Sequence, residues 1–372
     1  MPNISVERIK KVNYSKKVDF HSHFLSKTYY EYLEKYEGPT PDGFPTPKWS
    51  VESHLELMDK LGVAFAFISV SSPNLSAADK ETEIEMVHRI NIEGIELVRS
   101  CPDRLALMAS LPLPHTYEAV DEAKFAVENL GANGFGLSTH YAGIYLGDPS
   151  YDPLMEYLDS IGAVIAVHPV TPAAVQKGVN DELPIPAMEF LMDTTRTFTN
   201  MFMHDIFGRY PNIKWIFPHG GAFLSILSDR MNGFVTQFRS NMKNPGPMDF
   251  KADMRHVYFD LAGFPANKQI HDLLLDVTEK NLLYGSDTPY TPNVACIAQT
   301  GLLEKSSDLT EAQKQDAFTL NAVRLFPWLG NILGVHTDGK TVCYADTPLN
   351  KKEGLNRNVR IFMSKVYGAV FK

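Results

Sequence analysis

The segment VDFHSH (residues 18–23) places two histidines two positions apart at the end of a short apolar run. Residues i and i+2 of a β-strand point to the same face, so His21 and His23 are expected to project together, with Asp19 one pleat below. Seven further short apolar runs also end in polar or glycine-rich residues. They are FAFISV (65–70), RLALMASL (104–111), NGFGLSTH (133–140), AVIAVHP (163–169), KWIFPHGG (214–221), VYFDLAG (257–263) and LLYGSDTP (282–289). The sequence therefore predicts eight strands.

Helical patterns lie between most of these strands. In SVESHLELMDKLG (50–62), Val51, Leu55, Met58 and Leu61 form an apolar stripe that ends at a glycine. Similar patterns occupy residues 83–100, 116–131, 151–162, 187–211 and 310–330. This alternation predicts an α/β fold whose parallel strands close into a (β/α)8 TIM barrel. An open doubly wound sheet is the alternative, but no GxGxxG or Walker loop follows any strand.

One domain is predicted for residues 1–334. Residues 34–50 are rich in proline and glycine and are expected to form a loop inserted after the first strand. Residues 335–372 are expected to form a C-terminal extension. Its end, NVRIFMSKVYGAVFK (358–372), has the pattern of an amphipathic helix.

The composition narrows the class of partner. Lys and Arg number 35 against 44 Asp and Glu, which gives a net charge of -9. An acidic chain without basic runs is not expected to bind nucleic acid or an anionic membrane as its main partner. The three cysteines are scattered and form no CxxC pair, which argues against a zinc knuckle or a disulfide framework. We therefore expect a cytoplasmic protein.

Metal-compatible side chains recur at the ends of the predicted strands. Besides His21 and His23, His168 ends the fifth strand, His219 the sixth and Asp287 the eighth. In a (β/α)8 barrel the C-terminal ends of the strands meet at one mouth. Imidazoles with a carboxylate suit one divalent cation, with zinc favoured and manganese compatible. Taken singly, His168 is more simply a core or capping histidine and Asp287 a turn residue, so the prediction depends on their common position.

Several motifs resemble one known family. DFHSHF (19–24), AVHP (166–169), PHGGAF (218–223), DRMNGF (229–234) and LLYGSDTPY (282–290) occur in the order found in the amidohydrolase superfamily. They are most similar to its aminocarboxymuconate-semialdehyde decarboxylase branch. The loop PDGFPTPKWS and LELMDKLG point to 6-methylsalicylate decarboxylase-type members. The resemblance implies a distorted barrel with one divalent metal.

The resemblance also implies roles for individual residues. It makes His21, His23, His168 and Asp287 the metal ligands, and His219 an acid/base group beside the metal. Arg230, eleven residues beyond His219, would reach the neighbouring subunit's site and bind the substrate carboxylate, so a homodimer is implied.

Other positions bear on the substrate. The helix after the first-strand loop carries His54 and no arginine, which argues against the muconate semialdehyde as substrate. Four phenylalanines are candidates to wall an aromatic ring, and each can equally be plain core: Phe24, Phe190, Phe198 and Phe223.

These features favour a metal-dependent, non-oxidative decarboxylase of a 2-hydroxybenzoate-type acid such as 6-methylsalicylate. Asp287 would donate a proton to the ring carbon, and His219 would bind the carboxylate or assist the transfer. One alternative is a hydrolase that opens a lactone or cleaves an amide with a metal-bound hydroxide, with His219 as the base. Another is a non-enzymatic barrel with a structural metal, although such a site needs no spare acid/base group.

Overall fold

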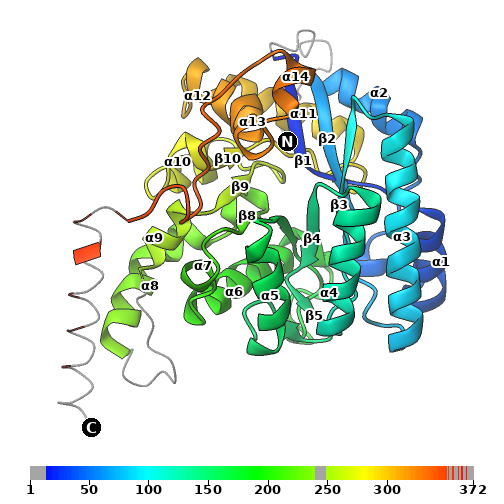
Figure 1. Cartoon of the computed structure of the whole chain (residues 1–372), viewed down its shortest axis with the longest axis horizontal. Coiled ribbons are helices and arrows are strands. Elements are labelled where there is room, and N and C mark those ends of the chain that lie inside the picture. Colours follow the sequence, from blue (N-terminus) through cyan, green and yellow to red (C-terminus); the bar gives the residue numbers. More distant parts are fainter. Residues whose placement is uncertain are drawn as a thin grey trace.

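A single sheet of eight strands forms the centre of the protein. The structure, a computed structural model, describes residues 14–238 and 249–349 and the positions 351, 354, 355, 359, 362 and 366. Helices lie around the strands (Figure 1). Around the sheet the strands follow the order β1 (Lys17–His23), β2 (Val63–Ser69), β3 (Leu105–Ala109), β4 (Gly134–Ser138), β7 (Val164–His168), β8 (Lys214–Phe217), β9 (Tyr258–Asp260) and β10 (Leu282–Leu283).

The first and last strands meet, which closes the sheet into a barrel. Parallel bridges join Asp19 to Tyr284 and Ser22 to Thr288. The amide of Phe20 donates to the carbonyl of Tyr284 at 3.0 Å. All neighbouring strands of this sheet pair in parallel. The predicted (β/α)8 barrel is therefore confirmed, and the open doubly wound sheet is excluded.

The helices occupy the crossovers between strands or follow β10, the last strand of the sheet. They are α1 (Lys27–Tyr32), α2 (Val51–Leu61), α3 (Lys80–Ser100), α4 (Thr116–Phe125), α5 (Asp152–Ser160), α6 (Glu189–Met203), α7 (Ile206–Arg209), α8 (Leu224–Phe238), α9 (Phe250–Arg255), α10 (Lys268–Leu273), α11 (Asn293–Lys305), α12 (Glu311–Gln315), α13 (Asn321–Leu325) and α14 (Leu329–Leu333). Short single-turn helices and a small hairpin complete the chain: η2 (Leu33–Glu37), η3 (Pro41–Gly43), η4 (Ala126–Leu130), η5 (Pro149–Tyr151), η6 (Ile185–Ala187), η7 (His219–Gly221), η9 (Glu279–Asn281), η10 (Asp316–Leu320), β5 (His140–Tyr141) and β6 (Ile144–Tyr145).

Local signals set the ends of α2 as the sequence predicts. The hydroxyl of Ser50 accepts from the amide of Ser53, and the Ser53 side chain in turn accepts from the amide of Ser50. Gly62 ends the helix in the left-handed conformation, with φ +69°. Glycine adopts this conformation without the steric cost that a Cβ brings.

Two of the predicted helices are interrupted. The stretch 187–211 divides into α6 and α7 because Asp205 turns into the left-handed region, with φ +54°. The stretch 310–330 divides into α12, η10, α13 and α14. The last break falls at Phe326, where a following proline disfavours helical geometry.

The lower part of the barrel is filled with apolar side chains. Val18, Phe20, Phe65 and Phe67 belong to this interior, and the Phe20 and Phe67 rings stack with centroids 4.5 Å apart. Phe326 stacks on Phe67 at 4.6 Å and covers the bottom of the barrel. With this end packed, the C-terminal ends of the strands are where polar side chains can gather around a cavity.

A bulge in β1 changes which side chains point inward. Asp19 pairs with Ala66 and Ser22 with Ile68, so three steps along β1 match two along β2. Such a bulge reverses the inward and outward alternation. Phe20 therefore belongs to the barrel interior below the bulge, while His21 and His23 gather inside above it.

The described part of the extension runs irregularly along the barrel. The amide of Val342 donates to the hydroxyl of Tyr258 at 3.2 Å, and the amide of Ala345 donates to the carbonyl of Pro211 at 3.1 Å. The predicted helix at 358–372 falls almost wholly outside the described residues. Among the described helices, none combines the length and apolar character needed to cross a bilayer.

Candidate metal centre

Four side chains from three distant stretches of the sequence converge at the top of the barrel. His21, His23, His168 and Asp287 each offer one ligand atom, and these atoms all lie within 4.8 Å of one another. Nε2 of His21 and Nε2 of His23 lie 3.4 and 3.5 Å from Oδ1 of Asp287. The ring centroids of the three histidines lie 4.9 to 5.2 Å apart. These residues end β1 and β7 or follow β10.

In each of the three histidines, Nδ1 contacts an atom outside the four candidate ligands. Nδ1 of His21 lies 2.9 Å from Oδ2 of Asp260, and Nδ1 of His168 lies 2.7 Å from the carbonyl oxygen of the following proline. Nδ1 of His23 lies 3.2 Å from Oγ of Ser69. Because a carbonyl or carboxylate oxygen can only accept, Nδ1 donates in His21 and His168 and Nε2 is left to face the centre.

The Nε2 atoms are suited to hold a cation. Nε2 of His21 and of His23 are buried without a hydrogen-bond partner among the described residues. Buried polar atoms are normally paired, so each such atom requires an explanation. Nε2 of His168 has one neighbour, Oγ of Ser71 at 3.3 Å. Three imidazole nitrogens and one carboxylate form a ligand set that fits a single divalent metal.

Burial and charge set the ionisation of this group. Burial lowers the pKa of His168 well below its ordinary value, and His23 and His21 add to the effect. Burial alone would raise the pKa of Asp287, but the ion-pair contacts with His21 and His23 lower it well below its usual range. Burial alone would lower the pKa of His21, but Asp260 and Asp287 raise it. Neutral imidazoles and an ionised carboxylate are the metal-binding forms, so a metal would displace a proton from His21.

Asp260 is a site residue that sequence reasoning missed. Oδ2 of its buried carboxylate contacts His21, and Oδ1 accepts from the amides of His219 and Ala262, both at 3.1 Å. A carboxylate behind a metal-binding histidine fixes the orientation of the ring and raises its basicity. One signal could have found it, because Asp260 ends its strand as His168 does.

The Asp19 carboxylate accepts hydrogen bonds from backbone amides and is not among the candidate metal ligands. Its Oδ1 accepts from the amides of His21 and Ser286, at 3.0 and 3.1 Å. Burial raises its pKa to about 7. Because these bonds join β1 to the segment that carries Asp287, Asp19 stabilises the bulge that turns the histidines inward. The expectation that Asp19 lies one pleat below the histidines overlooked this bulge.

His219 lies beside the four candidate ligands and outside them. Its ring centroid is 5.0 Å from that of His21 and 6.3 Å from that of His168. Burial lowers its pKa to about 4. Its backbone has φ +56°, a strained conformation for a residue with a side chain. Asp260 and Gln269 hold this conformation through hydrogen bonds to the His219 amide and carbonyl.

Asp287 also has a strained backbone, with φ +62°. Its amide donates to the carbonyl of His21 at 2.7 Å, and its Oδ2 accepts from the hydroxyl of Thr291 at 2.7 Å. Strained conformations of this kind persist only where the surroundings enforce them, and they gather at functional sites. His219 and Asp287, the two predicted catalytic residues, both show this feature.

The position of the His219 ring depends on Gly263, and replacing this glycine tests that dependence. A Cβ at Gly263 would lie 2.8 Å from Cδ2 of His219, and the backbone there has φ +74°. We expect Gly263→Ala to lower the free energy of unfolding by about 1–3 kcal/mol and to reduce turnover. Denaturant unfolding and steady-state rates measure both effects.

Gly131 offers a matched control. It has φ +76°, yet nothing lies within 4 Å of its Cβ position. Gly131→Ala should therefore show the cost of a positive φ alone, with unchanged turnover. Equal losses of stability and of rate in the two variants would show that contact with His219 is irrelevant.

A cavity opens above the metal group. It has a volume of about 470 Å³, and its walls are mostly proline, phenylalanine and other apolar residues. Among the described residues that line it there is no lysine or arginine. The lining residues are Pro41, Asp42, Phe44, Pro45, Pro47, Ser71, Ser72, His168, Pro186, Ala187, Phe190, Leu191, His219, Gly263, Phe264, Asp287, Tyr290, Thr291, Pro292 and Ala295.

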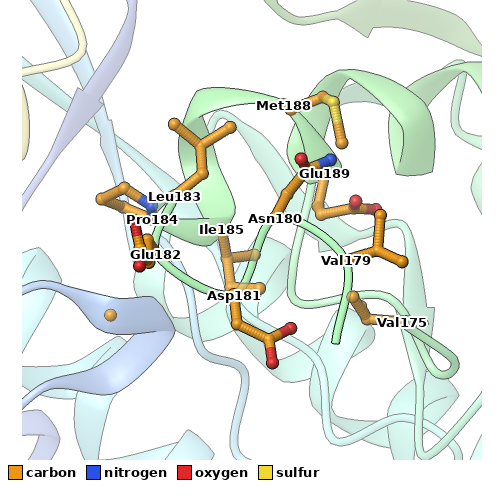
Figure 2. A pocket seen from close by; sticks show the side chains of 11 residues that line it. Val175, Val179, Asn180, Asp181, Glu182, Leu183, Pro184, Ile185, Met188 and Glu189 are labelled. Atoms are coloured by element: carbon orange, nitrogen blue, oxygen red, sulfur yellow. The ribbon is translucent and has the colours of Figure 1, made fainter. Parts of the chain in front are cut away.

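Two loops border this cavity, the predicted insertion after β1 and the segment before α6. A second hollow of about 320 Å³ is lined by Gly43 of the insertion and by residues between Val175 and Glu189. Figure 2 shows the part of its lining that comes from the segment before α6 and the start of α6. Figure 2 shows Leu183, Pro184 and Ile185 on the loop that precedes α6. Residues of both loops therefore line the hollow and the cavity.

The predicted substrate-binding residues lie in different places. Phe24 is buried in the core, 6.4 Å from the Trp49 ring between centroids, and is not among the described residues lining the cavity. Phe223 is also absent from that lining, and its amide donates to the Thr195 hydroxyl. Arg230 is exposed on α8 and stacks on Phe234 at 4.6 Å.

The two further aromatic candidates separate in the same way. Phe190 lines the cavity with its ring 5.9 Å from that of His168, and Phe198 lies in the core. Aromatic lining residues that sequence analysis did not name are Phe44, Phe264 and Tyr290.

Comparison with known proteins gives consistent matches. Residues 18–328 match the family model described as Amidohydrolase. The decarboxylase yanB of Aspergillus niger is 32% identical over 325 residues, which cover 84% of this chain and 87% of the relative. The 6-methylsalicylic acid decarboxylase of Penicillium expansum is 27% identical over 321 residues, which cover 85% of this chain and 98% of that protein.

Solved structures show the same fold. A crystal structure of an amidohydrolase II protein is 38% identical with a TM-score of 0.79, and the match covers 83% of this chain and 99% of that one. The dihydroxybenzoic acid decarboxylase of Polaromonas sp. JS666, with bound manganese and the inhibitor 2-nitroresorcinol, is 20% identical with a TM-score of 0.73. That match covers 84% of this chain and 97% of the Polaromonas chain.

Proposed function

We propose that this chain, which belongs to the amidohydrolase family, is a metal-dependent, non-oxidative decarboxylase of a 2-hydroxybenzoate-type aromatic acid, 6-methylsalicylate being the model. One observation carries the proposal. Three histidines and an aspartate with inward-facing ligand atoms lie beside a largely apolar cavity that also contains His219, a histidine outside the ligand group. The names of the relatives, decarboxylases including one of 6-methylsalicylic acid, support the reaction type.

The types of the four candidate ligand residues indicate which metal ions the site could bind. Nε2 of His21, His23 and His168 with one oxygen of Asp287 would hold a divalent cation such as zinc. The same mixed ligand set accepts manganese, the ion bound in the Polaromonas decarboxylase. When bound, the cation would supply positive charge that offsets the negative charge of the substrate beside these residues.

The reaction needs a proton at the ring carbon that carries the carboxylate. Loss of CO₂ without it leaves an aryl carbanion, whereas an ortho hydroxyl donates electron density to that carbon and permits protonation. Oδ1 of Asp287 faces His21 and His23, so Oδ2, which contacts Thr291, is the atom proposed to deliver the proton. The bond from the ring to the carboxylate then breaks, its electron pair restores aromaticity, and CO₂ leaves.

The ionisation of Asp287 has to change for this step. In the free site its pKa lies well below the usual range, so it holds no proton at neutral pH. A negatively charged substrate that also excludes water raises the pKa of a carboxyl group. His219, whose Nδ1 is buried without a hydrogen-bond partner among the described residues, is proposed to bind the substrate carboxylate or to assist the transfer.

We further propose that the protein acts as a homodimer in which Arg230 serves the neighbouring site. Within one subunit Arg230 is exposed on α8, outside the described lining of the cavity. Because the described lining contains no lysine or arginine, Arg230 of a second copy would supply the positive charge that the substrate carboxylate needs. The resemblance of the sequence to the family first suggested this role.

Metal analysis coupled to a CO₂-release screen tests the proposal. Purified protein should contain about one zinc or manganese per chain and release CO₂ from ortho-hydroxylated aromatic acids without oxygen, nicotinamide or flavin. Chelation should abolish the release, and added metal should restore it. Uptake of water by lactones or amides, with no CO₂, would instead establish the hydrolase. Protein that unfolds on chelation and turns over neither substrate class would contain only a structural metal.

A further inference from the structure

We propose that Asp42 sets the substrate specificity of the cavity by excluding aromatic acids that carry a second carboxylate. The inference rests on the proposed decarboxylase function and narrows its substrate class to monocarboxylic acids. The ring edge that faces Asp42 would bear hydrogen or a hydroxyl group. Three observations carry this inference: the position of Asp42, its hydrogen bonds and the charges around it.

Asp42 belongs to the insertion after β1 and lines the cavity together with His168 and Asp287. Its hydrogen-bond partners show where it lies. Ser72 and Thr171 each follow the last residue of a strand, Ser69 or His168, by three positions. Asp42 therefore lies one layer beyond the candidate metal ligands, on the side of the cavity where the loops meet.

Two hydroxyls and one backbone amide hold the Asp42 carboxylate. Oγ of Ser72 donates to Oδ2 at 2.6 Å, Oγ1 of Thr171 donates to Oδ1, and the backbone amide of Thr171 also donates to this carboxylate. A carboxylate offers about four lone-pair positions, so one remains for another donor. A phenolic hydroxyl can fill such a position, whereas a second carboxylate cannot donate.

Among the described residues that line the cavity, no lysine or arginine offsets the negative charge of Asp42. The titratable groups in this described lining are Asp42, His168, His219, Asp287 and Tyr290. Burial raises the pKa of Asp42 although both hydroxyls oppose the shift. Asp42 also contributes to the raised pKa of Tyr290. Surroundings that already disfavour the negative charge of Asp42 will disfavour a second negative charge beside it more strongly.

The position of Asp42 explains how its negative charge would discriminate between substrates. The reacting carboxylate belongs at the metal group, so a second acid group on the ring has to point toward the loops or remain in water. A like charge placed close by in a partly desolvated site costs affinity, and such repulsion is a general route to specificity. The remaining wall near Asp42 is apolar, with Phe44, Pro45 and Pro47 from the same loop.

A pair of isosteric substrates isolates the charge. We would compare 2-hydroxybenzoates that bear either a carboxylate or a carbamoyl group at ring position 4 or 5, using the purified full-length protein with bound metal. The wild type should favour the carbamoyl compound by roughly 10- to 100-fold in kcat/KM. Asp42→Asn keeps the size of the side chain and removes its charge, so it should reduce this preference to within about threefold.

Thr171→Val provides the matched control for a purely structural role. It removes one hydrogen bond to Asp42 and leaves the carboxylate in place. If Asp42 only fastens the loops, Asp42→Asn and Thr171→Val should lower kcat/KM for both substrates by similar factors and leave their ratio unchanged. That result would overturn the proposal, while a ratio that changes only in Asp42→Asn would support it.

A binding measurement separates this inference from the proposed reaction. Calorimetric titration of the two compounds reports the preference without any turnover. If the wild type releases no CO₂ yet binds the carbamoyl compound better, and Asp42→Asn removes that difference, the decarboxylase fails and the selectivity stands. If CO₂ is released but the wild type binds both compounds equally, the selectivity fails and the decarboxylase stands.

Discussion

We expect His168→Ala to lose the divalent metal and, with it, all measurable decarboxylation. The variant removes one of three imidazoles whose ligand atoms lie within 4.8 Å of one another. His168 is also the histidine whose pKa burial and neighbouring histidines lower most clearly, so it is neutral and ready to bind a metal at neutral pH. Metal content per chain after gel filtration, together with CO₂ release, measures the outcome.

His88→Ala serves as the control for histidine loss. His88 lies on α3 and its Nδ1 is 2.9 Å from Oε2 of Glu122, outside the metal group. It should keep both metal and activity. Because His168 is buried, circular dichroism must show that the His168→Ala variant is folded. A folded His168→Ala protein with full metal content would remove His168 from the ligand set.

The strands and four candidate ligands could be predicted because their signals are local. Each strand is a short apolar run with a polar end, and a barrel brings such ends to one mouth. Their strand-end positions indicated that His21, His23, His168, His219 and Asp287 would meet, and the resemblance to the family named four of them as ligands. The structure brings the candidate ligand atoms of His21, His23, His168 and Asp287 together because the fold fixes where a strand end lies. Their role as metal ligands stays a prediction.

The remainder depends on contacts between distant parts of the chain. The β1 bulge follows from how β1 pairs with β2 and from the Asp19 hydrogen bond to Ser286, which the alternation of β1 does not encode. The role of Asp260 as the partner of His21 requires β9 and β1 to be placed together. Likewise, no periodic pattern distinguishes Phe24, which follows β1 and packs in the core, from Phe190 of α6, which lines the cavity.

The second large effect concerns the histidine beside the metal group: His219→Asn should keep the metal and lose turnover. His219 lies outside the four-residue ligand group, so its loss leaves the candidate coordination intact. Asparagine tolerates a positive φ better than most residues, and it suits the φ of +56° at this position. The backbone bonds to Asp260 and Gln269 can therefore persist while the imidazole is removed.

The size of that loss discriminates between roles for His219. General acid–base catalysis typically contributes about 10²–10⁴-fold to the rate, so kcat should fall by that factor with metal content unchanged. A group that only binds the substrate carboxylate would raise KM and leave kcat nearly intact. Loss of the metal together with activity would make His219 a ligand instead. Retention of full kcat and KM would show that neither proton transfer nor binding of the carboxylate uses this ring.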